Sequence, residues 1–170
     1  MKKIKRFLKL LLHSSTGTAG LIIVVVICLC AIFAGQLAPH DPNAMDLTNM
    51  TKPPVWMEGG DWNNVLGTDN LGHDILSRML YGARISLVVG ILATLMSGAA
   101  GMLLGLVSGY YGGLADHIIM RVADAFYAIP GILLALVTLM VFQRSGITTL
   151  VLVIAAISWV PYARLIRSEV

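Results

Sequence analysis

Charged residues are scarce in this sequence. Only 12% of its 170 residues are Asp, Glu, Lys or Arg, whereas 57% are hydrophobic. An ordinary soluble domain carries about 25% charged residues, and a soluble core of this size does not need so much apolar surface. The shortage of charge therefore argues against a soluble domain and predicts an all-α protein that crosses a membrane several times.

Cysteine is also rare, with Cys28 and Cys30 as the only two. They stand two residues apart within an apolar run, so they point to different sides of one helix. A disulfide or a metal site needs a shared face or more ligands. We interpret both as small apolar side chains, and they indicate nothing about the redox compartment.

The residues that carry out common catalytic chemistry are missing or scattered. The sequence has no Gly-rich phosphate loop followed by Lys and Ser or Thr, so we expect no ATP hydrolysis by this chain. The four histidines, His13, His40, His73 and His117, lack metal-ligand spacing. The apolar runs contain no ionisable groups, which argues against an intramembrane enzyme or an ion-coupled transporter. We therefore expect no catalytic residue, no metal and no cofactor in this chain.

Four runs without charge are long enough to span a bilayer, which takes about 20 helical residues. They predict transmembrane helices at residues 14–38, 85–107, 125–142 and 146–163. The first run would also suit a cleaved signal peptide. However, its apolar stretch is longer than a signal core, and Pro39 makes the bond after Ala38 a poor cleavage site. We interpret it as an uncleaved anchor.

The distribution of Lys and Arg predicts the orientation, because cytoplasmic loops are enriched in both. With a cytoplasmic N-terminus, eight basic residues lie inside (Lys2, Lys3, Lys5, Arg6, Lys9, Arg121, Arg164, Arg167) and four outside (Lys52, Arg78, Arg84, Arg144). The remaining segments are then a basic cytoplasmic N-terminus (1–13), an external loop and surface helix (39–84), a cytoplasmic turn with the start of the third helix (108–124) and a cytoplasmic end (164–170). The basic N-terminus suits orientation and anionic lipid, so nucleic-acid binding is not expected.

A polar segment, residues 66–84, precedes the second predicted span. It reads LGTDNLGHDILSRMLYGAR. Charged groups at the bilayer centre cost about 2.5 to 3.5 kcal/mol each, so the segment must lie at or outside the membrane surface. Apolar residues at helical spacing predict a short surface helix that leads into the span. Upstream, Trp56 and Trp62 are either interfacial anchors or close a small hairpin, and the sequence does not distinguish these roles.

Small residues recur every four positions in the second span, at Ser97, Gly101, Gly105 and Gly109. Such a face allows another helix to approach closely, either within this chain or from another subunit. In the turn SGYYGGLAD we expect Gly109, Gly112 and Gly113 to reverse the chain.

The third predicted helix begins with Asp116, whose carboxylate suits the positive end of the helix dipole. Arg121 and Asp124 are three residues apart and can pair on one face. Pro130 is expected to kink this helix.

Three blocks of the sequence resemble a known family. They are LGTDNLGHDILSRMLYGARISLVVG, GLVSGYYGGLADHIIMRVADAFYAIP and WVPYARLIRSEV. In order and distance they are similar to permease subunits of ATP-binding-cassette importers for dipeptides, oligopeptides and nickel, and most similar to the second, dipeptide-C-like subunit. The resemblance extends from about Gly17 to the end. Its external motif comprises Gly67, Thr68, Asp69, Leu71, Gly72, Asp74, Ser77 and Arg78, and its helix-3 motif comprises Asp116, Arg121, Asp124 and Pro130. None of these residues is catalytic.

The resemblance implies a type I importer permease fold of six spanning helices, of which this sequence holds the N-terminal four. It implies a second permease subunit, two cytoplasmic ATPase subunits that bind ATP and magnesium, and an external substrate-binding protein. The expected location, among membrane lipid, is the plasma membrane of a bacterium or archaeon, which is the inner membrane in a Gram-negative cell. The subunit would form half of a transmembrane pathway, and we hypothesise that this pathway is lined near Pro130 and by the glycine-rich face of the second helix. Peptides are favoured as substrates because the segment PPVWMEGGDWN resembles peptide-type members of the family more than nickel-type ones. The alternatives are import of nickel or another small solute, and a short non-transporting membrane interaction or assembly protein.

Two departures from the family pattern stand out. His73 occupies a position where the family usually has Arg, so an ion pair there would depend on pH if His73 faces a carboxylate. The sequence also stops at Val170, shortly before the point where the family's cytoplasmic coupling loop should begin. We therefore expect the sequence to be the N-terminal portion of a longer permease.

Overall fold

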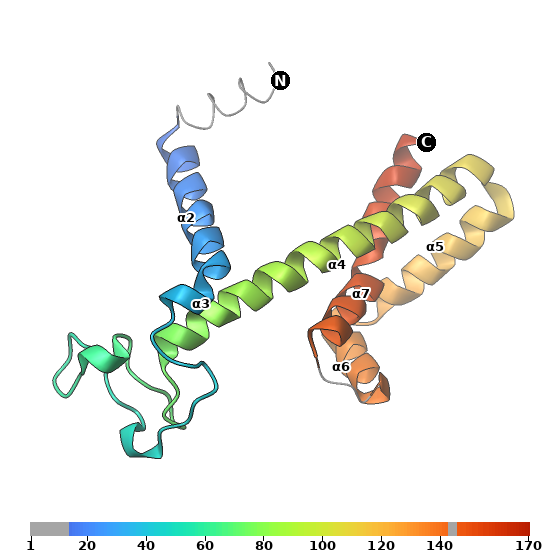
Figure 1. The fold of residues 1–170 in the computed structure, drawn as a ribbon. Coiled ribbons are helices and arrows are strands. Elements are labelled where there is room, and N and C mark those ends of the chain that lie inside the picture. Colours follow the sequence, from blue (N-terminus) through green and yellow to red (C-terminus); the bar gives the residue numbers. More distant parts are fainter. Residues whose placement is uncertain (1–13, 143–145) are drawn as a thin grey trace. The chain divides into compact units, whose positions relative to one another are not determined.

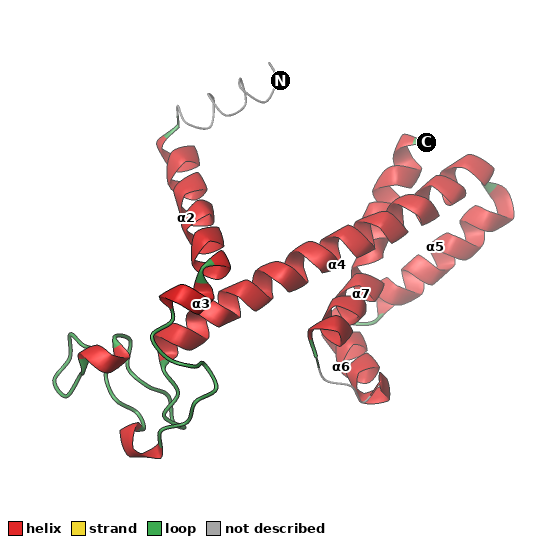
Figure 2. Cartoon of the chain, in the orientation of Figure 1, coloured by secondary structure: helices red, strands yellow, loops and turns green. Residues whose placement is uncertain are grey.

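The computed structural model describes residues 14–142 and 146–170 (Figure 1). The predicted basic N-terminus at 1–13 and Arg144 lie outside the described residues. The described part consists of helices, turns and loops, with one isolated antiparallel bridge between Thr68 and Asp74 and no strand (Figure 2). The predicted all-α fold class is confirmed.

The chain divides into two compact units, Met1–Leu87 and Val88–Val170. The first unit contains α2 (Ser15–Ile32), α3 (Ala34–Leu37), two short 3-10 turns at Leu47–Asn49 and Trp62–Asn64, and the first turns of α4 (Ile75–Tyr111). The second unit contains the rest of α4, then α5 (Gly113–Ala128), α6 (Gly131–Phe142) and α7 (Ile147–Glu169).

Within residues 14–142 and 146–170, three helices, α2, α4 and α7, are long and apolar enough to cross a membrane, and a fourth crossing exists if α5 and α6 together form one span. The helix α2 carries no charged residue and starts at an N-cap, where the Ser14 side chain accepts a hydrogen bond from Gly17 N at 3.0 Å. The chain then breaks at Phe33, and α3 ends at Leu37. The segment predicted at 14–38 is thus built from two helices.

The third predicted span is not one kinked helix. A break at Ile129 and Pro130 separates α5 from α6, and the two axes differ by 93°. Pro130 has no N–H to donate and disfavours a helical conformation at the preceding residue. Accordingly, Ile129 is extended, with φ −102° and ψ 127°. The single helix predicted for 125–142 is therefore corrected to the end of α5 followed by α6.

The second predicted span and the surface helix before it are one continuous helix. At about 1.5 Å per residue, the 37 residues of α4 extend for about 55 Å, well beyond a hydrocarbon core of about 30 Å. The predicted boundary at residues 84 and 85 does not exist, because the sequence offers no helix-breaking residue there. Only the nine residues Leu66 to Asp74 of the polar segment lie in a loop.

The glycine stripe of α4, defined here as Gly101, Gly105 and Gly109, packs against α7. A Cβ atom built on Gly101 would lie 2.5 Å from the carbonyl oxygen of Trp159, and one on Gly105 would lie 2.6 Å from that of Ala163. A Cβ on Gly109 would lie 2.8 Å from the Cβ of Val170. Of the two interpretations of these three residues, the structure shows packing within the chain. The fourth small residue, Ser97, is buried and donates to the carbonyl oxygen of Thr94 at 3.2 Å.

This packing corrects two expectations. The glycine-rich face of α4 is covered by α7, so it does not line an open pathway within this chain. Gly109 lies inside α4 rather than in the turn, which is made by Gly112 and Gly113 with φ of +58° and +50°. Positive φ is costly for residues with a Cβ, so glycine suits this reversal.

An apolar cluster joins α5 to α7 in the second unit. Ala123 of α5 is buried with Trp159, Val160 and Ala163 of α7. The ring of Phe126 meets the Trp159 indole edge to face, with centroids 5.9 Å apart. The cluster therefore fixes α5 beside α7 close to the glycine stripe.

The glycine stripe predicts a position-specific effect of adding one methyl group. Alanine normally stabilises a helix interior by up to about 1 kcal/mol relative to glycine. At Gly105 we expect the opposite, a loss of about 1 to 3 kcal/mol, because the added Cβ overlaps the α7 backbone. The matched control is Gly98→Ala on the same helix, where a Cβ meets nothing within 4 Å. Unfolding titrations in mixed detergent micelles measure both changes, and equal stabilities for the two variants would contradict the packing.

Candidate functional site

The residues of the external motif hold the loop against the start of α4. Asp74 caps the helix, because its Oδ2 accepts hydrogen bonds from the Ser77 N–H at 2.8 Å and the Ser77 hydroxyl at 2.7 Å. Its Oδ1 accepts from Asn64 Nδ2 at 3.0 Å. The Ser77 hydroxyl in turn accepts from the His40 N–H at 3.1 Å. Asp74 and Ser77 are buried, so this cap joins three loop segments in a protected place.

Two glycines of the motif are required by the backbone. Gly67 and Gly72 have φ of +80° and +79°, in the left-handed region. A Cβ on Gly67 would overlap the carbonyl oxygen of Lys52, and one on Gly72 would overlap the main chain of Asp46. Any other residue would therefore strain the turn and push two loop segments apart.

Thr68 joins the motif to the preceding loop. Its hydroxyl donates to the carbonyl oxygen of Asn49 and accepts from the Lys52 N–H at 2.9 Å. Its own N–H donates to the Lys52 carbonyl oxygen at 3.1 Å. Thr68 is buried, so these bonds are shielded from competing water. The side chain of Leu71, by contrast, is exposed.

Asp69 is the electrostatic centre of the motif. Its Oδ1 accepts from the N–H groups of Leu71 and His73, both at 2.9 Å, while Oδ2 lies 2.9 Å from His73 Nδ1 and accepts from Arg78 Nη1. Burial acts to raise the pKa of this carboxyl. The hydrogen bonds from the His73 and Leu71 amides, with those of the His73 side chain, outweigh burial and hold the pKa well below its ordinary value.

His73 therefore faces a carboxylate, which was the condition for a pH-dependent ion pair. Its Nδ1 also lies 3.1 Å from Arg78 Nη1. One nitrogen cannot donate to Asp69 and accept from Arg78 at the same time. The Asp69 carboxylate thus has both the His73 ring and the Arg78 guanidinium against it.

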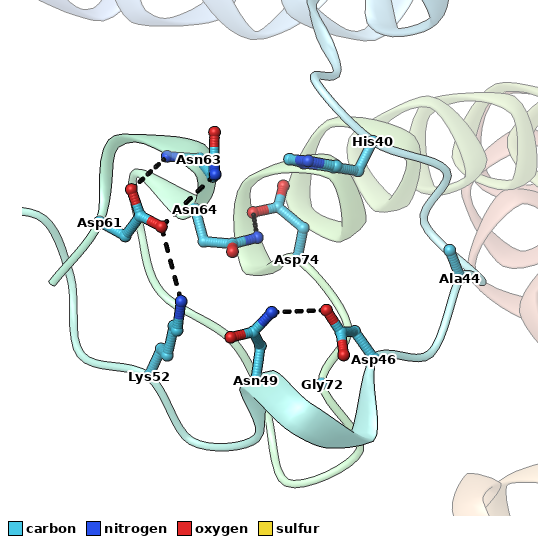
Figure 3. Close-up of a pocket in the computed structure, with 10 residues that line it drawn as sticks. All are labelled: His40, Ala44, Asp46, Asn49, Lys52, Asp61, Asn63, Asn64, Gly72 and Asp74. Atoms are coloured by element: carbon cyan, nitrogen blue, oxygen red, sulfur yellow. Dashed lines mark hydrogen bonds and ion pairs between the residues drawn. The ribbon is translucent and has the colours of Figure 1, made fainter.

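A small polar pocket of about 180 Å³ opens beside the motif (Figure 3). Its lining residues are His40, Ala44, Asp46, Asn49, Lys52, Asp61, Asn63, Asn64, Gly72 and Asp74. The three carboxylates already have partners within the chain: Asp46 accepts from Asn49, Asp61 faces Lys52 at 3.5 Å, and Asp74 accepts from Asn64. Within the described residues, no three acidic, His or Cys side chains gather in a way that would hold a metal ion.

The two tryptophans before the motif do not close a hairpin with their side chains. Trp56 is 68% exposed and Trp62 is 79% exposed. The hairpin is instead joined by a main-chain hydrogen bond from Val55 N to the Val65 carbonyl oxygen, at 3.1 Å. Their assignment as interfacial anchors stays a prediction.

The helix-3 motif contributes two ion pairs between α5 and α7. Asp116 accepts from Arg167 at 2.5 Å and also from the Ser108 hydroxyl. Asp124 accepts from Arg164 at 2.8 Å. Such partly exposed pairs contribute at most about 1 kcal/mol each to stability, so their importance is geometric. They tie the last turns of α7 to α5.

The expected pair between Arg121 and Asp124 does not form among the described residues. Asp124 is paired with Arg164 instead, because the apolar cluster brings α7 alongside α5. Arg164 and Arg167 entered the prediction only through the orientation of the chain in the membrane, and Ser108 was not predicted to take part. The two acidic residues of α5, Asp116 and Asp124, and the two basic residues of α7, Arg164 and Arg167, were the available signal, but using it requires knowing that α5 and α7 are neighbours.

Comparison with known proteins gives matches at both ends of the chain. Residues 4–54 match the N-terminal TM domain of oligopeptide transport permease C, and residues 101–170 match the binding-protein-dependent transport system inner membrane component. A dipeptide transport system permease protein of Haemophilus influenzae is 44% identical over 149 residues, covering 88% of this chain and 50% of the relative. A di/tripeptide transport system permease protein of Pseudomonas aeruginosa is 38% identical, covering 98% of this chain and 55% of the relative. An Escherichia coli dipeptide permease is 41% identical, covering all of this chain and 56% of the relative.

The helices and these matches define a multi-pass α-helical protein of the bacterial inner membrane. The chain belongs to the permease family of ATP-binding-cassette importers, in its dipeptide-C-like branch. The resemblance seen in the sequence is thereby confirmed. The chain spans about half the length of the curated relatives that it matches.

We predict that the loop containing the external motif becomes less stable in acid, because acidic side chains hold it in place. Asp69 and Asp74 both have pKa values below the ordinary 3.8 in the folded state, where hydrogen bonds outweigh the effect of burial. Their contribution to stability is therefore complete well above that pH and is lost as the pH falls through and below it. Hydrogen exchange of the amides in residues 46–78, corrected for intrinsic rates, should show protection that falls as the pH is lowered from about 5 to about 2.

The variant Asp69→Asn provides the control for this pH dependence. It removes one of the carboxyl groups whose pKa is lowered in this loop, so the protection of the variant should be lower at neutral pH and should depend less on pH. Protection that stayed constant down to about pH 2 in the unmodified protein would contradict the assigned pKa directions.

Proposed function

We propose that the full-length protein is a permease subunit that forms half of the transmembrane pathway of an ATP-driven importer for dipeptides or oligopeptides. The observation that carries this proposal is the similarity of nearly the whole chain to peptide permeases, at 38% to 44% identity. The packed spans, together with a sequence that has no phosphate-binding loop, fit a subunit that changes conformation but does not itself hydrolyse ATP.

Under this proposal, ATP is bound and hydrolysed by partner subunits. Two cytoplasmic ATPase subunits would bind ATP and magnesium, a second permease subunit would form the other half of the pathway, and an external protein would deliver the substrate. This chain would hold no cofactor and carry no catalytic residue. Its contribution is a wall of the pathway and a mechanical link to the ATPases.

The geometry of the second unit suggests how motion would be transmitted. The last turn of α7 is held to α5 by the Asp116–Arg167 and Asp124–Arg164 pairs, and Gly109 of α4 lies against Val170. A displacement applied at the end of α7 would therefore move α4, α5 and α7 together. We infer that closure of the ATPases opens and closes the pathway through this three-helix group.

Transport in a reconstituted system tests the proposed function. The full-length protein is placed in liposomes together with the second permease, the ATPases and the binding protein encoded beside it. ATP is supplied on the side of the membrane that faces the ATPases. We expect uptake of a labelled dipeptide that stops when a non-hydrolysable ATP analogue replaces ATP. Uptake of nickel but not of peptide would overturn the substrate assignment, and uptake of neither by a fully assembled complex would favour a non-transporting protein.

A further inference from the structure

One carboxylate, that of Asp116, is bonded to two neighbouring helices at once. Asp116 lies in the first turn of α5. Its Oδ1 accepts from the Ser108 hydroxyl of α4, and its Oδ2 accepts from Arg167 Nη2 of α7, both at 2.5 Å. Within residues 88–142 and 146–170, no other carboxylate bonds to the side chains of two other helices. These three residues, Ser108, Asp116 and Arg167, are called the Asp116 link here.

The Ser108 hydroxyl departs from the behaviour of the other bonded hydroxyls in this unit. Those of Ser97, Thr138 and Ser168 each donate to a carbonyl oxygen three or four residues back in their own helix. Such a bond satisfies a hydroxyl without any neighbouring helix. Ser108 is 1% exposed and donates to Asp116 instead. Because a charged acceptor gives a stronger hydrogen bond than a neutral carbonyl group, this bond ties α4 to α5.

The second ion pair of α5 reaches only one other helix. Asp124 bonds to Arg164, whose guanidinium also lies 4.6 Å from the ring centroid of Tyr127, a residue of α5. Loss of the Asp124 carboxylate would therefore leave Arg164 in contact with α5. Loss of the Asp116 carboxylate would leave the side chains of Ser108 and Arg167 without a partner among the described residues. The two pairs thus differ in how many helices they join.

The end of α7 packs against α4 directly beside the Asp116 link. A Cβ on Gly109, the residue after Ser108, would lie 2.8 Å from the Cβ of Val170 and 3.4 Å from the carbonyl oxygen of Arg167. Figure 1 shows this end of α7 next to the turn between α4 and α5. Dispersion contacts are individually weak and hardly directional, whereas charge-assisted hydrogen bonds are directional and oppose sliding. The carboxylate therefore adds a resistance to sliding that the packing alone does not supply.

We propose that Asp116 is a positioning residue for energy coupling, because its carboxylate transmits a displacement of the end of α7 to α4 and α5. This inference rests on the proposed function, in which ATPase subunits act on the cytoplasmic side of the protein. Without the carboxylate, the glycine stripe and the apolar cluster still pack the three helices together. The last turn of α7 then moves without carrying α4, so ATP is hydrolysed with less transport.

The ratio of peptide taken up to ATP hydrolysed measures this coupling. The full-length protein with Asp116→Asn is assembled with its partner subunits in liposomes, and both rates are measured with a labelled dipeptide. We expect the ratio to fall at least about fivefold, since an uncharged amide binds Arg167 only weakly. The matched control is Asp124→Asn, which removes an equal charge from the same helix. It should lower the ratio by no more than about twofold, because Arg164 keeps its contact with Tyr127.

A merely structural role of Asp116 would give a different result. A less stable complex loses uptake and ATP hydrolysis together, so its ratio stays constant. A constant ratio for Asp116→Asn, or equal falls for Asp116→Asn and Asp124→Asn, would overturn the proposal. If the Asp116→Asn complex does not assemble, Ser108→Ala and Arg167→Gln each remove one bond of the same carboxylate. Each should then lower the ratio at least about twofold, and an unchanged ratio in either would refute the proposal.

A spin label distinguishes failure of this inference from failure of the proposed function. The label is attached at Ser168→Cys in the full-length protein, with all native cysteines replaced, and its mobility is read from the spectral line shape without any transport. Asp116→Asn should raise this mobility, and Asp124→Asn should raise it less. An unchanged line shape for Asp116→Asn would refute the Asp116 link and leave the proposed function standing. Raised mobility in an assembled complex that takes up no peptide would refute the proposed function and keep the link between α7 and α4.

Discussion

The close approach of α4 and α7 across the glycine stripe is the contact on which the second unit depends. A single added Cβ at Gly101 or Gly105 would run into the α7 backbone. Because membrane helices gain little from hydrophobic burial against each other, such close packing is a main source of their association. With α7 held there, Trp159 and Ala163 reach α5, and the two arginines of its last turns reach Asp116 and Asp124.

The external motif follows a different constraint, the need to satisfy buried polar groups. Asp74, Ser77 and Thr68 are buried, and each hydrogen-bonds to another segment of the loop or to the helix that follows. Gly67 and Gly72 allow the turns that bring these groups together. The polar side chains of the motif are thus occupied by one another. Their role is to fix the loop on the start of α4.

Much of this architecture could be predicted from the sequence because it rests on local properties. Long runs without charge give the apolar helices, and Gly residues at spacing four predict a face for close packing. Pro130 correctly marked an interruption of the third segment, although its size was underestimated: proline removes a hydrogen bond wherever it stands, but the 93° angle depends on what α6 packs against.

Other features depended on tertiary neighbours and were missed. The spacing of Arg121 and Asp124 predicted a pair within α5, yet the neighbouring α7 supplies Arg164 to Asp124. Gly109 was placed in the turn because it stands among other glycines, whereas its contact with Val170 keeps it in the helix. The continuity of α4 through residues 84 and 85 was missed because a change in polarity along the sequence was taken as a structural boundary. A helix can continue from water into lipid without a break.

The most direct test of this account is a disulfide across the glycine stripe. In the full-length protein without native cysteines, the pair Gly109→Cys and Val170→Cys is oxidised in native membranes. The two Cβ atoms would lie 2.8 Å apart, so a shift of about 1 Å gives disulfide geometry. We predict that the disulfide forms within one chain. When differently tagged copies are mixed, each linked pair of proteolytic fragments should then come from a single copy. A disulfide only between copies, or none, would show that α7 of this chain does not cover the stripe.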